Sequence, residues 1–256
     1  MALIELKHIY KRFGWLEVLS DVNLQVEQGK CLVILGASGS GKSVMLKHIV
    51  GLLKPDRGEV WFAGQRIDIL SERELMKVRE RFGFLFQQSA LFDSDNVARN
   101  VGFPLMEHTN KKPEEIAEIV NHKLRMVGLP DIGRKMPAEL SGGQRKRVAL
   151  ARAIALDPEV ILYDEPTTGL DPIRSDVINE LIVKLQTQMH VTSVVVTHDM
   201  NSAFKVADRL VMLFEGKLIF DGTPDDIRTT KNEVVSRFVH GEASEEELRT
   251  LESVQD

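Results

Sequence analysis

The clearest chemical pattern in the chain is a short glycine-rich segment. Residues 36–43 read GASGSGKS and match the spacing G-x-x-x-x-G-K-[ST] of a phosphate-binding loop, with an apolar run before it and a helix-like run after it. Successive backbone N–H groups can wrap a phosphate there, while Lys42 offers a charge to the β- and γ-phosphates and Ser43 a hydroxyl to Mg²⁺. A chance glycine-rich turn is the weaker alternative. The expected nucleotide contacts are Gly36, Ala37, Ser38, Gly39, Ser40, Gly41, Lys42, Ser43 and Val44.

Two adjacent carboxylates end another apolar run, VILYDE at 160–165. We expect Asp164 to hold Mg²⁺, usually through water. Glu165 would lie within reach of a water in line with the γ-phosphate and would orient or deprotonate it. The alternative, that both carboxylates only cap the turn before Pro166, is weak beside a phosphate loop.

A histidine and a glutamine complete the set of catalytic candidates. His198 ends the run SVVVTH (193–198), and its imidazole could bind the γ-phosphate, although a histidine at a strand end is more often structural. Gln87 follows a fourth apolar run and could bind Mg²⁺ and the attacking water, with Gln88 as the competing residue. The predicted catalytic residues are Glu165, His198, Gln87 and Lys42, and the predicted metal ligands are Ser43, Gln87 and Asp164.

A second segment suited to anions begins at residue 140, where the chain reads LSGGQRKRVALARAIALDP. Ser141 is a good helix N-cap, and the exposed N–H groups of a helix start attract anions. Adjacent glycines at such a start cost conformational entropy and indicate a close approach to the backbone. We expect the basic residues at 145–147 to form a solvated face of this helix.

The elements that position these residues alternate between strands and helices. The runs at 31–36, 160–165 and 193–198 are short and continuously apolar, as in a parallel sheet buried on both faces, and ligands bind beyond the carboxyl ends of such strands. Helices are expected at 42–53, from the segment at 140, and at 171–188. Residues 58–67 read as a β-hairpin arm, and an amphipathic helix at 111–129 belongs to a helical insert of about 88–139.

Composition sets further bounds. The chain has 256 residues, 43% of them apolar, which is enough for a large α/β core, and a formal net charge of −5, which does not favour a nucleic-acid partner. The single cysteine, Cys31, is expected to be a small buried apolar side chain in a reducing compartment. No run approaches the ~18 apolar residues of a membrane span, and no signal peptide is evident, so we expect a cytoplasmic protein that meets a membrane through a partner.

The order of these motifs resembles the ABC-type ATPase family: phosphate loop, a glutamine after an apolar run, LSGGQ, a strand ending in Asp-Glu, a Leu-Asp loop and a late histidine. The resemblance covers residues 3 to about 240 and implies a P-loop α/β fold with a mostly parallel core sheet, an antiparallel β arm and a helical insert. It implies an ABC nucleotide-binding domain at 1–240, followed by an acidic tail at 241–256.

In that family two ATPase subunits pair head to tail, and the LSGGQ segment of one closes on the ATP held by the other. The resemblance therefore implies a second copy as partner, with Ser141, Gly142, Gly143 and Gln144 contacting its ATP and Asp171 contacting its phosphate loop. It also implies that Phe13 stacks on adenine, with Trp15 and Tyr10 close enough to compete.

Three segments, at 100–109, 128–143 and 169–182, look most like the Mla/MCE-type subunits of the family. That resemblance implies an ATPase on the cytoplasmic face of the inner membrane that powers a separate permease for phospholipids. The permease would dock near Gln87 and residues 89–105, and an MCE-domain lipid-binding protein and a small accessory subunit would be further partners. An importer or exporter of amino acids, metals or drugs is the main alternative. A soluble ABC protein acting on ribosomes or DNA lacks support, and a P-loop kinase has no use for LSGGQ.

Overall fold

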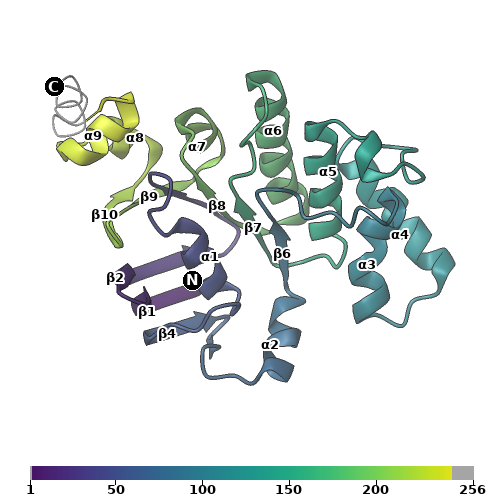
Figure 1. The fold of residues 1–256 in the computed structure, drawn as a ribbon, viewed down its shortest axis with the longest axis horizontal. Helices are drawn as coiled ribbons and strands as arrows, with labels where there is room; N and C mark the ends of the chain where they lie inside the picture. Colours follow the sequence, from purple (N-terminus) through teal and green to yellow (C-terminus); the bar gives the residue numbers. More distant parts are fainter. Residues whose placement is uncertain (1, 244–256) are drawn as a thin grey trace.

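The predicted apolar runs form the centre of the main sheet. The computed structural model describes residues 2–243. In spatial order its main sheet contains β10 (Lys217–Gly222), β9 (Arg209–Phe214), β3 (Cys31–Leu35), β8 (Thr192–Thr197), β7 (Val160–Asp164) and β6 (Phe82–Leu85). The strands β3, β8 and β7 lie side by side and pair in parallel (Figure 1). Within this sheet only β10 runs antiparallel to its neighbour, so the expected mostly parallel core sheet is confirmed.

Both faces of this sheet are buried because successive side chains of a strand point to opposite sides. One core contains Cys31 and Val33 with the apolar faces of the helices, whereas the other contains Leu32 and Ile34 with the smaller sheet. Cys31 is fully buried, and burial raises the pKa of its thiol, as expected for a cysteine that serves as an apolar side chain.

The smaller sheet is antiparallel and includes the predicted hairpin arm. Its strands, in spatial order, are β2 (Leu16–Glu27), β1 (Ala2–Phe13), β4 (Arg57–Phe62) and β5 (Gln65–Arg66). The hairpin expected at 58–67 is therefore present. The two long N-terminal strands were not predicted, and they place Phe13 at the end of β1, next to the phosphate loop.

Helices α5, α6 and α7 pack in the core on the face of the main sheet opposite the smaller sheet, whereas α1 and α2 pack in the core that the two sheets share. Helices α3 to α5 stand together beyond the β6 edge (Figure 1). The helices are α1 (Lys42–Ile49), α2 (Glu72–Arg79), α3 (Val97–His108), α4 (Pro113–Met126), the 3₁₀ turn η1 (Pro137–Glu139), α5 (Gly142–Ala153), α6 (Pro172–Met189), α7 (Met200–Val206), α8 (Pro224–Arg228) and α9 (Glu233–His240). Within residues 2–243, none of these helices combines the length and apolar character needed to cross a bilayer.

Helix α1 and the helical insert differ in how far their expected limits can be compared with the structure. The helix expected at 42–53 ends at Ile49, because Gly51 adopts the left-handed conformation (φ 68°) and its N–H donates to the carbonyl of His48, which closes the helix. Helices α3, α4 and η1 lie within residues 88–139, whose limits as an insert remain a prediction. The predicted acidic tail lies outside the described residues from residue 244 onward.

Candidate nucleotide-binding and hydrolysis site

A cleft of about 310 Å³ lies where β3, β8 and β7 end. It collects side chains from the phosphate loop, the Gln87 loop and the ends of two neighbouring strands, as expected for an α/β sheet. Its lining residues are Phe13, Val18, Ser38, Gly39, Gly41, Lys42, Ser43, Val44, Gln87, Glu165 and His198. The structure thus brings together the four predicted catalytic residues, most of the phosphate loop and two of the three predicted metal ligands.

The phosphate loop has the backbone that its glycines allow. Gly39 and Gly41 have φ values of 80° and 104°, which bend the chain around the loop centre. A Cβ at Gly36 would lie 2.5 Å from the carbonyl oxygen of Leu213, so this position has no room for a side chain. The loop is therefore shaped for a ligand that approaches the backbone closely.

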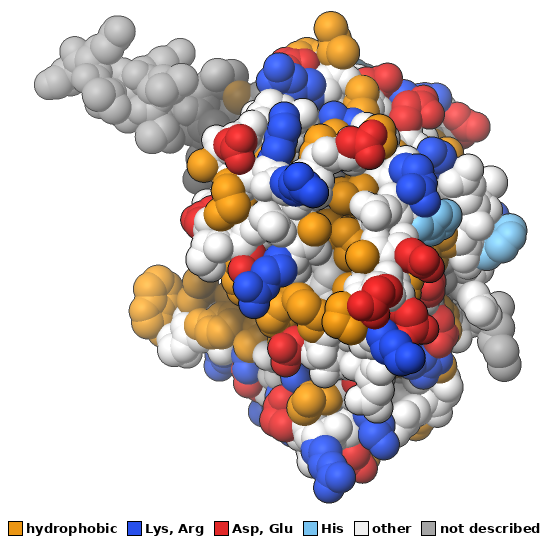
Figure 2. Space-filling model, turned by 90° about the vertical axis from the view of Figure 1, so that its right-hand side faces the viewer, with side chains coloured by type: hydrophobic (Ala, Val, Ile, Leu, Met, Phe, Trp, Pro, Cys, Tyr) orange, Lys and Arg blue, Asp and Glu red, His pale blue; other side chains and the backbone are white. Residues whose placement is uncertain are grey.

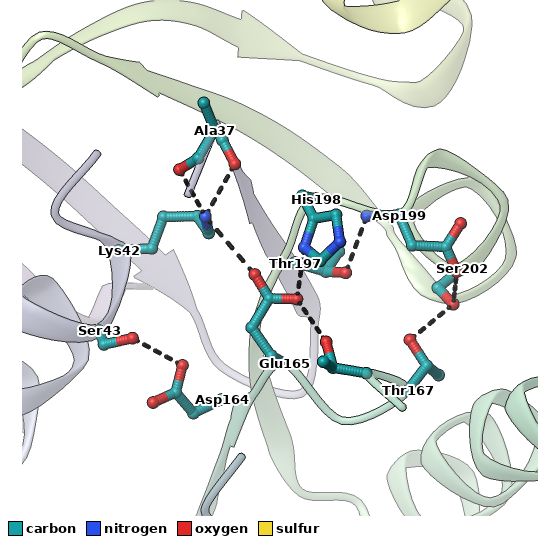
Figure 3. Close-up of polar contacts among 12 residues, drawn as sticks. Ala37, Lys42, Ser43, Asp164, Glu165, Thr167, Thr197, His198, Asp199 and Ser202 are labelled. Atoms are coloured by element: carbon teal, nitrogen blue, oxygen red, sulfur yellow. Dashed lines mark hydrogen bonds and ion pairs between the residues drawn. The ribbon is translucent and has the colours of Figure 1, made fainter. Parts of the chain in front are cut away.

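Lys42 points into this loop (Figure 3). Its side chain is 6% exposed, and its Nζ donates to the carbonyls of Gly36 at 2.7 Å and Ala37 at 2.9 Å. The same ammonium lies 3.5 Å from Oε1 of Glu165. A fixed cation next to a ring of backbone N–H groups is suited to the oxygens of a β- or γ-phosphate.

Ser43 and Asp164 form the part of the site that fits a cation. The Ser43 hydroxyl donates to Oδ1 of Asp164 at 2.8 Å (Figure 3). Burial raises the pKa of the Asp164 carboxyl, the bond from Ser43 opposes this, and the charge of Glu165 raises the pKa further. Among residues 2–243 no cluster of three or more His, Cys, Asp or Glu side chains could hold a metal. A few hard oxygen donors beside a phosphate site fit Mg²⁺, which retains waters and binds substrate phosphates.

Glu165 is held in a strained and nearly enclosed position. It is 8% exposed, and its φ of 48° is unusual for a residue with a side chain, at a cost of about 1–3 kcal/mol. Its backbone N–H donates to the carbonyl of Val196 at 3.0 Å. Its carboxylate accepts from the Thr168 hydroxyl at 3.2 Å and lies 2.9 Å from Nδ1 of His198. The carboxylate therefore has a fixed direction, toward the centre of the cleft.

His198 is anchored by a buried hydroxyl network that sequence analysis missed (Figure 3). The N–H of Asp199, the next residue, donates to the Thr197 hydroxyl at 3.0 Å, and the Ser202 hydroxyl donates to Oδ2 of Asp199 at 2.6 Å. Ser202 Oγ also lies 3.4 Å from the Thr167 hydroxyl and accepts from the Asn179 amide at 2.9 Å. The histidine loop is thus joined to the loop after Glu165. Only the position of Asp199 directly after His198 could have pointed to this network.

Gln87, rather than Gln88, lines the cleft. The basic residues at 145–147 fit the expected solvated face only in part: Arg145 is exposed and Arg147 is half-buried, but Lys146 is buried. Lys146 is only 5% exposed; its Nζ donates to the carbonyl of Gln87 and to the carbonyl of Glu165, the latter at 3.3 Å. Arg145 and Arg147 also donate to backbone carbonyls, at Leu140 and Gly128. The reason is that this part of α5 packs on loops whose carbonyls need donors.

Among the aromatic candidates for adenine, only Phe13 lines the cleft. It is 46% exposed and so presents a free ring face. Trp15 is 90% exposed, and neither it nor Tyr10 lines the cleft. The geometry therefore favours Phe13 as the stacking residue.

The residues of the LSGGQ segment and Asp171 lie outside this cleft. Ser141 caps α5: its hydroxyl accepts from the N–H of Gln144, whose side chain accepts from the N–H of Ser141 at 2.9 Å. A Cβ at Gly142 or Gly143 would lie no closer than 3.6 Å to any neighbouring atom, and neither glycine has a positive φ. Nothing within the described chain requires glycine at these two positions. Asp171 caps α6 by accepting from the N–H of Arg174 at 3.0 Å.

Comparison with known proteins agrees with this geometry. The family described as ABC transporter matches residues 19–168. The probable ribonucleotide transport ATP-binding protein mkl of Mycobacterium leprae is 45% identical over 238 residues, covering 93% of this chain and 69% of that protein. The intermembrane phospholipid transport system ATP-binding protein MlaF of Haemophilus influenzae is 44% identical over 241 residues, covering 94% and 91%.

A solved structure supports the same assignment. The ATP-binding cassette MJ0796, in a dimeric post-hydrolysis state bound to ADP and Pi, superposes with a TM-score of 0.80 at 36% identity, over 86% of this chain and 98% of that one. The fold, the arrangement of the cleft and these similarities agree. The chain belongs to the ABC transporter family, as an ATP-binding subunit with the site of an ATPase.

Proposed function

We propose that this chain is the ATP-hydrolysing subunit of a phospholipid transporter and acts on a separate membrane permease. The resemblance to the Haemophilus protein supports phospholipid as the cargo, because it extends over nearly the full length of both chains. The mycobacterial relative, which is named for ribonucleotide transport and is longer than this chain, supports ribonucleotides as an alternative cargo. We also propose one nucleotide-binding domain at 1–240, with the helical insert at 88–139, peripheral on the cytoplasmic face of the inner membrane.

The glycine pair of the LSGGQ segment is the observation that carries the mechanism. Two glycines that the chain itself does not require stand at the N-terminus of a capped twelve-residue helix, which favours anions. These residues lie outside the chain's own cleft, so we propose that they bind the γ-phosphate held by a second copy. The dimeric state of MJ0796 supports such pairing. Asp171 would contact the partner's phosphate loop.

Within the cleft the proposed roles follow from the contacts. Lys42 and the loop N–H groups hold the β- and γ-phosphates, and Phe13 stacks on the base. Glu165 orients a water and accepts its proton, while His198, 2.9 Å from that carboxylate, fixes its direction and exchanges this bond for one to the γ-phosphate. Ser43, Asp164 and Gln87 would hold Mg²⁺, which when bound neutralises charge on the phosphates.

An apolar groove beside Gln87 supports the permease as partner. It has a volume of about 390 Å³ and is lined by Phe82, Gly83, Phe84, Phe86, Ala90, Phe92, Phe103, Pro104, Arg152, Ala153 and Leu156. It lies between β6, α3 and α5. On the side of the molecule that carries α3 and α4, Figure 2 shows apolar side chains exposed between charged ones. A short amphipathic helix of a permease fits such a groove. We also retain the MCE-domain protein and a small accessory subunit as proposed partners.

Two experiments test the proposal. In a Glu165→Gln background, ATP should convert the purified chain from monomer to dimer in sedimentation velocity, and Gly142→Asp should abolish this step by placing a carboxylate against phosphate. Gln28→Asp, a matched change in an exposed turn before β3, should leave the dimer intact. A Gly142→Asp variant that still dimerises with ATP would contradict the assigned role.

The cargo is tested by a tagged pull-down from solubilised native membranes, with mass spectrometry of proteins and lipids. Co-purification of a permease, an MCE-domain protein and bound phospholipid is the expected result. A different permease would keep the ATPase mechanism and exclude the phospholipid. Recovery of ribosomal or nucleic-acid-binding proteins without a permease would refute the transporter assignment.

A further inference from the structure

Three lysine side chains are buried among residues 2–243, and one of them has no assigned task. Lys42 belongs to the phosphate loop, and Lys123 of α4 forms an ion pair with Asp157. Lys146, on α5, is absent from the ion pairs of the described chain. Its ammonium instead donates to two backbone carbonyls, those of Gln87 and Glu165.

Burying the Lys146 ammonium without a carboxylate partner costs folding free energy, so its retention calls for a functional explanation. A buried cation without a carboxylate partner loses hydration that two carbonyls only partly replace. Burial lowers the pKa of the Lys146 ammonium, while the nearby charges of Asp164 and Glu165 raise it. The two negative groups of the hydrolytic site therefore help to keep this lysine charged, although neither touches it.

The two acceptors are backbone carbonyls of two residues that line the nucleotide cleft, and both residues have proposed roles in hydrolysis. Gln87 lies 59 residues before Lys146 in the sequence and Glu165 lies 19 residues after it. One side chain thus fixes the spacing between the Gln87 loop and the strained backbone at Glu165, whose φ is 48°. A displacement of either residue by about 1 Å could cost a hundredfold in rate.

The loop after Gln87 is strained as well and is held by the same helix. Ser89 and Ala90 both have left-handed backbone conformations, with φ values of 64° and 46°. Arg152 of α5 donates to their carbonyls at 2.9 and 2.8 Å. Backbone in such conformations persists only when its surroundings hold it. Helix α5 therefore holds three carbonyls of this loop, but only Lys146 also reaches Glu165.

The position of Lys146 on α5 connects the two parts of the proposed dimer site. It lies about 7.5 Å along the helix axis from the N-cap Ser141, at 1.5 Å per residue, within one rigid element. Ser141 and the glycine pair would meet the partner's ATP, whereas Lys146 contacts the site of its own chain. A shift of α5 on closure would move both together.

We propose that Lys146 is a positioning residue. From helix α5, which begins in the LSGGQ segment, it holds the Gln87 loop and the Glu165 backbone in the arrangement that hydrolysis needs. This inference rests on the proposed hydrolytic site. It assigns Lys146 no contact with ATP. Its loss should therefore lower turnover without weakening nucleotide binding.

The test compares Lys146→Met with Lys123→Met in the full chain. Both changes replace a buried lysine by an apolar side chain of similar length, but Lys123 pairs with Asp157 and touches neither loop. We expect Lys146→Met to lower kcat by about tenfold to a hundredfold with KM nearly unchanged. Hydrogen exchange, followed by mass spectrometry on a peptide covering residues 86–91, should become faster. Lys123→Met should lower Tm and leave both readouts as in the wild type. Lys146→Gln, which keeps an N–H donor, should recover part of kcat.

The outcomes separate this inference from the proposed function. A wild-type chain without ATPase activity, alone or with its permease, would refute the proposed function. An active wild type in which Lys146→Met keeps its kcat and exchange rate, or changes only Tm as Lys123→Met does, would refute the positioning role alone.

Discussion

Replacing Glu165 by glutamine separates binding from hydrolysis at this site. The change keeps the size of the side chain and an oxygen that can accept from Thr168 Oγ1, now 3.2 Å away. It removes the group that accepts the proton of water. A general base contributes about 10²–10⁴ in rate, or about 2.7–5.4 kcal/mol of transition-state stabilisation. We therefore expect kcat to fall by at least about a hundredfold.

Binding should respond differently. Neither the bonds of Lys42 to the loop carbonyls nor the hydroxyl of Ser43 depends on Glu165. Loss of a negative charge 3.5 Å from the Lys42 ammonium also frees that cation for phosphate. The ATP affinity should thus be equal to or tighter than that of the wild type.

The assay pairs steady-state phosphate release with equilibrium titration of a fluorescent ATP analogue. Glu159→Gln is the matched control, because Glu159 precedes β7 at the opposite end of the strand and pairs with Arg81 at 2.6 Å. It should leave both quantities unchanged. If Glu165→Gln hydrolyses ATP within about threefold of the wild type, Glu165 is not the general base, since that role is worth at least about a hundredfold.

Three further predictions concern Gly142, Asp164 and Ser202, with Asp56→Asn as a comparison for Asp164. Gly142→Ala should fold at least as stably as the wild type, with a gain of up to about 1 kcal/mol in the free energy of unfolding, yet lose ATP-dependent dimerisation; a denaturant titration and sedimentation measure the two. Asp164→Asn should raise Tm at pH 7 and abolish Mg²⁺-dependent turnover. Burial raises the pKa of the Asp164 carboxyl in the folded state, so its ionisation destabilises the fold as pH rises through that pKa. The gain in Tm from Asp164→Asn should therefore shrink at acid pH. The comparison variant Asp56→Asn should instead lower Tm, because Lys11 lowers the pKa of the Asp56 carboxyl. Ser202→Ala leaves the buried Asn179 amide without its acceptor and should cost about 1–3 kcal/mol of stability by chemical denaturation; a Tm equal to that of the wild type would contradict the network.

Much of the fold could be predicted from the sequence because the patterns that indicate it are local. The short apolar runs, the phosphate loop and the capped helix starts each depend on neighbouring residues, and their order predicted a parallel sheet with a common ligand edge. The N-terminal strands were missed because their polar and apolar residues alternate with irregularities. Register shifts interrupt the pairing of β1 with β2, so the expected period of two is broken.

The contacts that hold the site in shape could not be predicted in the same way. Lys146 sits in a basic triplet that has the composition of a solvated helix face, and only the fold brings its ammonium beneath a loop 59 residues earlier. Ser202 is an ordinary helix residue until the structure brings Thr167, 35 residues earlier, to within 3.4 Å of it. Residue type and spacing therefore identified most of the groups that line the cleft, whereas the groups that hold them in place depend on long-range packing.

The glycines of the phosphate loop and of the LSGGQ segment differ in whether the chain's own packing requires them. At Gly36 the chain itself requires glycine, because a Cβ would lie 2.5 Å from a backbone oxygen. At Gly142 and Gly143 the backbone is helical and the nearest atom is 3.6 Å from a Cβ, so alanine would fit and would favour the helix. Gly143 is buried, but Gly142 is partly exposed, so a glycine that weakens the helix and serves no packing purpose within the chain stands at its surface. The chain's own phosphate cleft does not include it, which supports the proposed contact with a nucleotide held by a second copy.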